Sequence, residues 1–323
     1  MSELPITCKD DVETALVYDC RDMSTLQGVK YSYWVLGSAL DDDALYMGTI
    51  KGNTPPSEHV LEQIKEALSQ VPAECIFPPL PFPWWLARTR VTVADDWDKE
   101  PSPDLYLKRP WITNLDAQPG ENNVARWFAH EIKQLEQLAR SPPHPNLLRY
   151  HGCRVRNGRV TGALLARVPG RDLESHLQNG GTVDKDLFFA ALASAVDYLH
   201  NVVGLVHNDI SPSNAMVGPD GAPTLIDLGS AYPDGEEMLA NVPYTYFVGP
   251  LTASPMSRKS RDIASLNHLR TWIENPVIET AGRRRRNETA SHFFKVGSEL
   301  HQAATARQKA IRAKAAEGNE TAA

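Results

Sequence analysis

Three polar side chains that could carry phosphoryl-transfer chemistry lie within one short stretch of this 323-residue chain. Asp209 and Asn214 belong to the segment 207–214, His-Asn-Asp-Ile-Ser-Pro-Ser-Asn, and Asp227 opens the tripeptide Asp-Leu-Gly. Between them the sequence predicts a strand, a turn rich in Gly, Pro and Asp, and a second strand. This ribbon would bring the three side chains to one end. Two of them could then hold a divalent cation, and the third could accept a proton from an attacking hydroxyl.

The spacing of these residues also resembles a known family. His-x-Asp-Ile-x-Pro-x-Asn followed by Asp-Leu-Gly resembles the catalytic and metal-binding loops of the eukaryotic protein kinase-like superfamily, in a divergent form. The resemblance implies that Asp209 orients the acceptor hydroxyl and takes its proton. It also implies that Asn214 and Asp227 bind Mg²⁺, with Mn²⁺ as an alternative, and that ATP is the phosphoryl donor. His207 would support the loop by packing and hydrogen bonding rather than bind metal.

Upstream of this stretch, the sequence predicts a strand and a helix in the order that the same superfamily has. Residues 105–108 predict a strand that ends at Lys108, and residues 122–140 predict an amphipathic helix that contains Glu131. By resemblance, Lys108 would contact the α- and β-phosphates of ATP, and Glu131 would form the ion pair that orients it. Glu136, on the same helix, is the alternative partner.

A hairpin with an Asn157-Gly158 turn follows the helix and leads to the predicted nucleoside pocket. The resemblance implies a hinge after the returning strand, followed by a short helix. Four residues would contact the nucleoside: Leu165 behind the adenine, the backbone of Ala166 and Val168 against it, and Asp172 at a ribose hydroxyl.

The second half of the chain is predicted to be mostly helical. Residues 184–200 repeat apolar side chains at helical spacing and lead directly into the segment 207–214. A further helix over 261–273 would bring Asp262 to brace the backbone of the catalytic loop. Residues 230–260 stand where the superfamily has an activation segment, but they contain no Ala-Pro-Glu element.

These elements predict an α+β, two-lobed protein kinase-like fold. Residues 76–168 would form a β-rich N-lobe, and residues 169–280 a mostly helical and shortened C-lobe. Residues 1–75 predict a β-rich extension with one helix, whose function the sequence does not reveal. The basic, Ala-rich tail at 281–323 is predicted to be helical or disordered.

The N-terminal extension carries strand patterns at 14–18, 29–36 and 44–50 and a helix after Ser57. Lys51 follows the third strand but is too far from the helix of Glu131 to replace Lys108. Residues 76–87 are rich in Pro and aromatic side chains. They could be a polyproline II ligand for an adaptor domain or an extended segment that packs on its own domain, and we favour the second interpretation.

Three departures from the family pattern affect the expected activity. No glycine occurs between Asn53 and Pro119, so no Gly-rich phosphate loop can precede Lys108. Asn208 stands where many kinases have the Arg that pairs with a phosphorylated activation segment, which predicts that this mode of activation is absent. Ser211 stands where serine/threonine kinases usually have a Lys beside the transferred phosphate.

Composition limits the class of protein. The formal net charge of −7 argues against nucleic acid as a partner, and no apolar run approaches the length of a membrane span. The N-terminus lacks a signal-peptide pattern. Four scattered cysteines fit reduced thiols in an intracellular protein, cytoplasmic or nuclear, and predict no zinc site: Cys8, Cys20, Cys75 and Cys153.

Three functions remain open at this point. The first is a divergent serine/threonine kinase that uses ATP and Mg²⁺. The second is a pseudokinase that binds partners, and in some cases nucleotide, without efficient transfer. The third is a phosphotransferase for small-molecule hydroxyls, because the residues that would dock a peptide are not evident.

Overall fold

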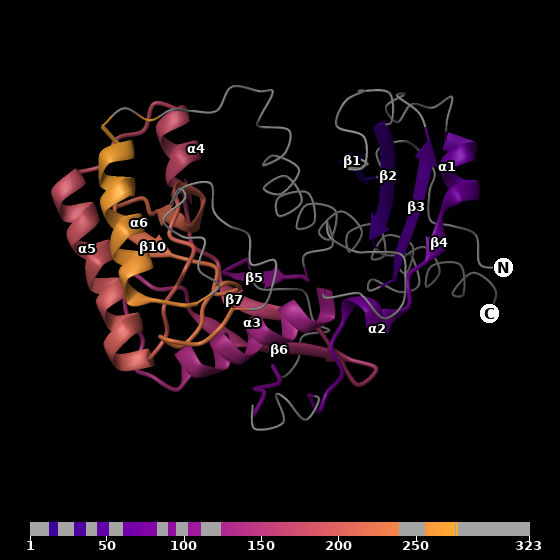
Figure 1. The fold of residues 1–323 in the computed structure, drawn as a ribbon, viewed down its shortest axis with the longest axis horizontal. Coiled ribbons are helices and arrows are strands. Elements are labelled where there is room, and N and C mark those ends of the chain that lie inside the picture. The colour runs from indigo at the N-terminus through magenta and orange to yellow at the C-terminus, as the bar shows by residue number, and fades with distance from the viewer. Residues whose placement is uncertain are drawn as a thin grey trace, which may run out of the picture. The chain divides into compact units, whose positions relative to one another are not determined.

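The computed structural model describes residues 13–18, 29–36, 44–51, 61–82, 90–94, 103–110, 124–238, 256–274 and 276. The chain divides into two compact units (Figure 1). The first takes residues 1–77, 111–124 and 281–323, and the second takes residues 78–110 and 125–280. All the predicted site residues belong to the second unit. The predictions for 281–323 lie outside the described residues.

The first unit contains a four-stranded antiparallel sheet in the order β1-β2-β3-β4. Its elements are β1 (Glu13–Tyr18), β2 (Val29–Leu36), β3 (Leu45–Lys51), α1 (Leu61–Ala67), β4 (Ser69–Gln70) and α2 (Ala73–Ile76). The three strands and the helix predicted here are therefore confirmed. Leu45, Ile76, Phe77 and Val124 form a small core of their own.

A three-stranded antiparallel sheet begins the second unit, in the order β5-β7-β6. Its strands are β5 (Leu105–Lys108), β6 (Tyr150–Arg156) and β7 (Arg159–Ala166). The predicted turn between β6 and β7 is confirmed: Asn157 and Gly158 both have positive φ, +50° and +69°, which Asn-Gly tolerates well. In this register Lys108 pairs with Ala163 on the central strand.

Helix α3 (Val124–Ala139) supplies apolar side chains to the core that it shares with this sheet, as its periodicity predicts. The buried positions recur three or four residues apart: Phe128, Ile132, Leu135 and Leu138. Glu131 lies next to this stripe and is itself buried. The helix can therefore present a carboxylate to the sheet from a rigid support.

The rest of the second unit is mainly helical. It contains β8 (Arg171–Asp172), α4 (Leu173–Gln178), α5 (Lys185–Tyr198), a π-helical turn (Leu199–Val203), a short 3₁₀ turn (Pro212–Asn214), β9 (Ala215–Val217), β10 (Pro223–Leu225) and α6 (Lys259–Trp272). Helices α5 and α6 run side by side (Figure 1). The α+β fold class is thus confirmed. Among the described residues, no helix is both long and apolar enough to cross a membrane.

Gly170 explains how the hinge after β7 can lie close to the ribbon. Its φ is +113°, and a Cβ added there would meet the carbonyl oxygen of Val217 at 1.9 Å. A side chain would push the hinge away from β9. Glycine at this position therefore couples the hinge to the strand that follows Asn214.

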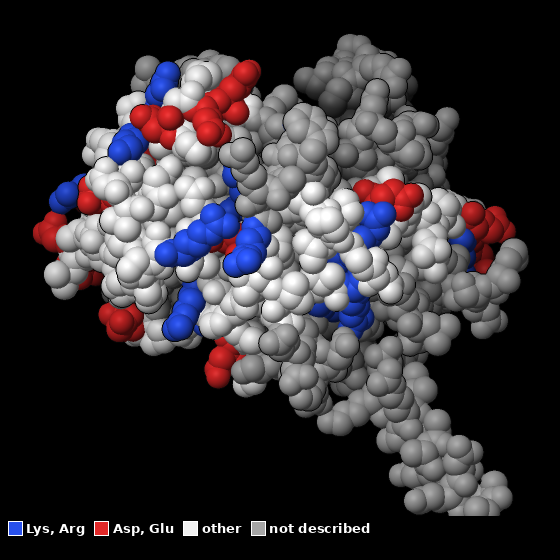
Figure 2. Space-filling view, turned by 90° about the horizontal axis from the view of Figure 1, so that it is seen from below, with Lys and Arg blue, Asp and Glu red and all other residues white. Residues whose placement is uncertain are grey.

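On the face shown in Figure 2, charged side chains of both signs are scattered and separated by uncharged residues. The described residues therefore form no continuous basic surface on this face. Nucleic-acid binding depends on such a surface to neutralise phosphates. The expectation that nucleic acid is not a partner stays a prediction.

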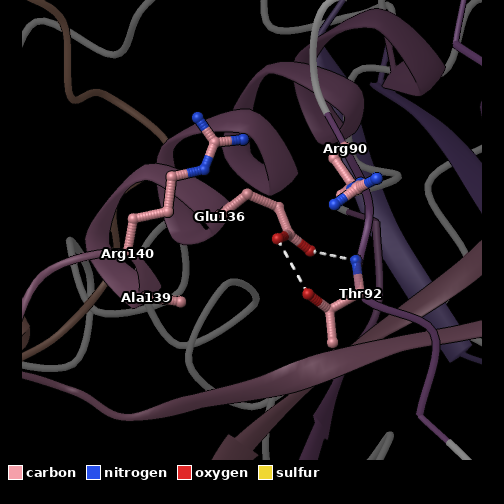
Figure 3. Close-up of a pocket in the computed structure, with 5 residues that line it drawn as sticks. All are labelled: Arg90, Thr92, Glu136, Ala139 and Arg140. Carbon is pink, nitrogen blue, oxygen red and sulfur yellow. Dashed lines mark hydrogen bonds between the residues drawn. The ribbon is translucent and has the colours of Figure 1, made fainter.

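Glu136 was the alternative partner for Lys108, but it joins residues 90–94 to α3 instead. Its carboxylate accepts hydrogen bonds from the backbone N–H and hydroxyl of Thr92, at 2.6 and 3.0 Å, and from the hydroxyl of Tyr150 at 2.8 Å. The backbone carbonyl of Thr92 also accepts the N–H of Cys153 on β6 at 2.7 Å. Figure 3 shows the hydrogen bonds between Glu136 and Thr92. They lie beside a pocket of about 510 Å³ that Arg90 and Arg140 help to line.

The extended packing favoured for the Pro-rich segment agrees with its described part. Phe82 is buried in the main core, and Pro79 pairs with Arg159. Residues 83–87 lie outside the described residues.

The hydrogen bonds of Glu136 with Thr92 and Tyr150 predict that substitutions here reduce stability. Glu136→Gln places an NH₂ group where donors now converge, so the free energy of unfolding should fall by about 1–3 kcal/mol. Thr92→Val removes one hydroxyl and should cost about 1 kcal/mol. Urea denaturation measures both, with Glu236→Gln at an exposed site as the matched control. An unchanged urea midpoint in Glu136→Gln would show that the hydrogen bonds of Glu136 contribute nothing to the free energy of unfolding.

Candidate functional site

The ribbon β9–β10 brings Asn214 and Asp227 together as predicted. The N–H of Ile226 donates to the carbonyl of Asn214 at 2.9 Å, which places the residues before β9 and after β10 side by side. Asp227 has a positive φ of +67°, and its Oδ1 accepts from the N–H of Gly229 at 2.9 Å. This turn directs the Asp227 side chain back toward the sheet and Lys108.

Asp209 is held by the other predicted metal ligand. The amide nitrogen of Asn214 donates to the Oδ2 and to the backbone carbonyl of Asp209, both at 2.9 Å. Oδ1 of Asp209 is buried and has no hydrogen-bond partner among the described residues. Burial raises the pKa of Asp209 well above its ordinary range, and the Asp227 carboxylate adds to this effect. One oxygen of the carboxylate is thus fixed, and the other awaits a donor.

Lys108 contacts Glu131, its predicted partner, and also Asp227, which the sequence analysis had not paired with it. Its Nζ lies 2.5 Å from Oε1 of Glu131 and 2.9 Å from Oδ1 of Asp227. Although burial works against the ammonium, the carboxylates of Asp227 and Glu131 raise the pKa of Lys108 above its ordinary value. Burial raises the pKa of Glu131 to about 7, and the Lys108 ammonium opposes this shift.

The lysine joins the two halves of the site. Lys108 belongs to the sheet β5-β7-β6, whereas Asp227 follows the ribbon β9–β10. Although burial works in the opposite direction, the Lys108 ammonium lowers the pKa of Asp227. Asp227 is therefore anionic at neutral pH and can serve as an oxygen ligand.

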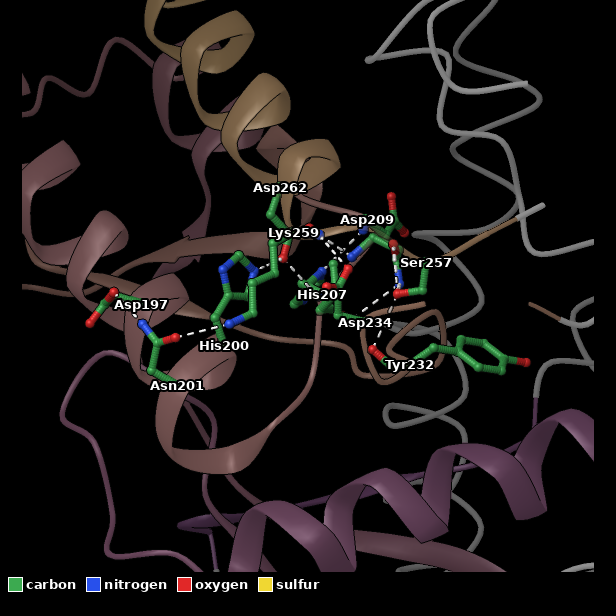
Figure 4. A network of polar contacts seen from close by, with 12 residues as sticks. Asp197, His200, Asn201, His207, Asp209, Tyr232, Asp234, Ser257, Lys259 and Asp262 are labelled. Carbon is green, nitrogen blue, oxygen red and sulfur yellow. Dashed lines mark hydrogen bonds and ion pairs between the residues drawn. The ribbon is translucent and has the colours of Figure 1, made fainter. Parts of the chain in front are cut away.

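The catalytic loop is anchored to helix α6 through Asp262, as expected from the sequence (Figure 4). The carboxylate of Asp262 is fully buried and accepts the backbone N–H groups of His207 and Asn208 at 2.7 and 2.8 Å. It also lies 2.7 Å from Nε2 of His200. Three donors thus compensate one buried carboxylate, and a shift of the loop would remove two of them.

His207 supports the loop as a neutral imidazole. Its Nε2 donates to the carbonyl of Ile226 at 3.0 Å, and its Nδ1 accepts the N–H of Asp209 at 3.2 Å. Both bonds form only when the proton resides on Nε2. Burial lowers the pKa of His207, which favours this neutral form. The geometry agrees with a supporting role and leaves no ring nitrogen for a metal.

The predicted nucleoside contacts are placed along the end of β7 and the hinge. Leu165 is buried, and the N–H of Ala166 is already bonded to the carbonyl of Arg149 at 2.8 Å. Ala166 could therefore offer only its carbonyl to a base. Asp172 caps α4 by accepting the N–H of Ser175 at 2.9 Å. Its predicted ribose contact stays a prediction.

Sequence analysis missed Tyr106 as a residue of this region. Tyr106 faces Leu165 in the β5–β7 register and lies two residues before Lys108, on the same side of the strand. Burial raises the pKa of its phenol, and Lys108, Asp227 and Glu131 are close enough to influence it. The alternation within Leu105–Lys108 could have revealed that Tyr106 shares the face of the lysine.

The oxygen atoms present fit a divalent cation. Asp227 is anionic. The side-chain NH₂ group of Asn214 donates to Asp209, which leaves the side-chain carbonyl oxygen of Asn214 for another partner. Mg²⁺ usually binds one or two protein oxygens together with phosphates and water. The described residues contain no cluster of three or more His, Cys, Asp or Glu side chains that could hold a metal ion. A cation here would thus depend on a phosphate ligand.

Several known proteins are similar in sequence to part of this chain. No family model matches the chain. A mouse (Mus musculus) protein, sperm motility kinase Tcr mutant form, is 32% identical over 106 residues, which are 32% of this chain and 21% of that protein. Serine/threonine-protein kinase CHK1 of Saccharomyces cerevisiae is 32% identical over 102 residues, or 31% of this chain and 19% of that protein. Mitogen-activated protein kinase kinase kinase 2 of Arabidopsis thaliana is 31% identical over 207 residues, or 54% of this chain and 31% of that protein.

The chain carries a protein kinase-like domain. It spans between 19% and 31% of the length of these three relatives. The kinase-like domain has a β-rich N-lobe with the sheet β5-β7-β6 and helix α3, followed by the ribbon and helices α4 to α6. The domain boundaries inferred from the sequence stay predictions.

A second histidine couples α3 to the residues after the Asp-Leu-Gly loop. His130 stacks on Tyr232, with ring centroids 4.1 Å apart, and its Nε2 lies 2.9 Å from the carbonyl oxygen of Ala231. Burial lowers the pKa of His130 from 6.5 to about 4. The helix that carries Glu131 thus also holds the start of the following segment.

This buried neutral histidine predicts a pH-dependent loss of stability. The unfolded chain protonates His130 near pH 6.5 and the folded protein only near pH 4, so stability should fall as pH decreases across that window. Relative to His130→Gln, the free energy of unfolding should drop by on the order of 3 kcal/mol. Urea denaturation of both proteins between about pH 7 and pH 4 measures the difference. Parallel curves would contradict a neutral buried histidine.

Proposed function

We propose that this domain transfers the γ-phosphoryl group of ATP to a serine or threonine hydroxyl of a protein. The observation that supports this most directly is the carboxylate of Asp209. Asn214 fixes one of its oxygens, and the other is buried with no partner among the described residues. A carboxylate with a raised pKa and one free oxygen is suited to accept the proton of an attacking hydroxyl.

The remaining residues would hold and orient the donor. Lys108, kept charged by two carboxylates, would contact phosphate oxygens, and Glu131 would keep its ammonium in place. Asp227 and Asn214 would hold Mg²⁺, or Mn²⁺. When bound, this cation would neutralise charge on the phosphates. The adenine of ATP would lie against Leu165 and the hinge at Ala166 and Val168, with Asp172 near the ribose.

Two features of the site would limit the rate of transfer. The chain has no glycine between Asn53 and Pro119, so backbone amides cannot wrap the phosphates closely from that side. Ser211 is buried, and its hydroxyl lies 2.9 Å from that of Ser213. It provides no positive charge beside the transferred group. Slow transfer is therefore expected.

Tyr106 favours a second candidate function. Its partly buried side chain lies on the face of β5 that carries Lys108, opposite Leu165, where the adenine of ATP is expected. If the ring fills that space, the domain would act as a pseudokinase that binds partners without transfer. A small-molecule hydroxyl is the other acceptor to test, since residues 230–260 contain no Ala-Pro-Glu element.

The transfer reaction gives a direct test with labelled ATP. Asp209→Asn should reduce transfer by at least about 100-fold because the proton acceptor is lost, while Mg²⁺-dependent binding of ATP persists. Asp227→Asn should abolish the metal-dependent part of ATP binding, measured as a thermal shift. Asp186→Asn, at an exposed site on α5, is the matched control and should behave as wild type.

The acceptor decides between the alternatives. Transfer to protein serine or threonine supports the proposal, and transfer to small-molecule alcohols alone supports the small-molecule enzyme. Metal-dependent ATP binding without any transfer supports the pseudokinase. If neither Mg²⁺ nor Mn²⁺ promotes ATP binding, the proposed roles of the site residues are wrong.

Replacing Tyr106 distinguishes a packing role from a blocking role. Under our proposal the Tyr106 ring packs against the adenine of bound ATP. Tyr106→Ala should therefore weaken ATP binding by roughly tenfold in calorimetry. Tyr106→Phe keeps the ring and should bind as wild type. Tighter binding by the alanine variant would instead identify the phenol as an obstacle and favour the pseudokinase.

A further inference from the structure

Asn208 occupies a constrained position inside the catalytic loop. It is buried, and its φ of +64° lies in the left-handed region, which Asn tolerates better than most residues. Its backbone N–H is bound to the carboxylate of Asp262 at 2.8 Å. The side chain therefore leaves a fixed backbone in a fixed direction, next to Asp209.

The side-chain amide of Asn208 joins three segments. Its nitrogen lies 3.1 Å from the carbonyl of Val206, 3.1 Å from the carbonyl of Ser230 and 3.0 Å from the hydroxyl of Ser257. Val206 precedes the catalytic loop, Ser230 follows the Asp-Leu-Gly loop, and Ser257 precedes α6. One neutral group thus ties the loop to both ends of the stretch between residues 230 and 257.

Ser257 completes this connection (Figure 4). It is fully buried, and its hydroxyl lies 3.2 Å from the carbonyl oxygen of Tyr232 and 3.4 Å from Oδ1 of Asn208. Its backbone pairs with Gly235 and Glu236 at 2.9 and 2.8 Å. The two ends of the stretch are therefore paired with each other as well as with the catalytic loop.

We propose that Asn208 is a positioning residue: its neutral amide, through Ser230 and Ser257, holds the catalytic base in register without any phosphorylation of the 231–257 stretch. This inference rests on the proposed function for its catalytic consequence, but not for its structural one. A buried amide needs only neutral acceptors, whereas a buried cation would need an added anion. Here the backbone carbonyls and a serine hydroxyl already satisfy the amide.

Two variants separate the amide from the backbone conformation. Asn208→Gly keeps the left-handed φ and the N–H bond to Asp262 but removes the amide. Asn208→Asp keeps the shape but places acceptor oxygens against the carbonyls of Val206 and Ser230. Asn267→Asp, at an exposed position of α6, makes the same chemical change outside the network.

Hydrogen exchange of the amides of Tyr232, Gly235 and Ser257 tests the structural part. Both Asn208 variants should exchange these amides roughly tenfold faster than wild type, and Asn267→Asp should match wild type. Wild-type exchange rates in Asn208→Gly would overturn the proposal. A thermal melt confirms that each variant is folded before comparison.

Transfer kinetics test the catalytic part. Phosphatase treatment should leave the wild-type rate unchanged, within about twofold, whereas Asn208→Gly should lower kcat by roughly tenfold with little change in KM for ATP. A wild-type rate that disappears after phosphatase treatment would overturn the inference. If the wild type transfers no phosphate, the proposed function fails, and the hydrogen-exchange result still decides the role of Asn208.

Discussion

The carboxylate of Asp262 lies fully buried on α6 and accepts the backbone N–H groups of His207 and Asn208. Because an unpaired buried charge is costly, these bonds fix the start of the predicted catalytic loop to α6. The ring of His200, in the π-helical turn after α5, contacts the same carboxylate. The position of Asp209, two residues after His207, follows from this anchor. The ribbon β9–β10 brings Asn214 and Asp227 close to Asp209, and the N–H of Ile226 donates to the carbonyl of Asn214.

Charge in this site is balanced across elements rather than within them. Lys108 on β5 lies between Glu131 on α3 and Asp227 after the ribbon, and each carboxylate keeps the ammonium charged. Asp209 forms no ion pair among the described residues, and burial together with the Asp227 carboxylate raises its pKa. Neighbouring carboxylates thus acquire different tendencies to hold a proton. Such a difference separates a metal ligand from a proton acceptor in acid-base chemistry.

Neutral side chains make several of the contacts around this site. The amide of Asn208 is satisfied by backbone carbonyls and by Ser257. The hydroxyl of Ser211 contacts that of Ser213. His130 links α3 to Ala231 as an uncharged ring. These contacts give the domain a site whose geometry is set by packing and neutral donors, and whose charge is concentrated on Lys108 and its carboxylate partners.

The sequence by itself determined the elements and most of the site. Local spacing revealed the ribbon, the Asn157-Gly158 hairpin and the helix with Glu131, because period and turn chemistry are written into neighbouring residues. The lysine–glutamate pair was found only through family resemblance. Tertiary structure alone decided that Glu136 binds Thr92, that Tyr106 faces Leu165, and that Asn208 reaches Ser257. These contacts join residues far apart in the chain, and no local pattern encodes which distant partner satisfies a buried polar group.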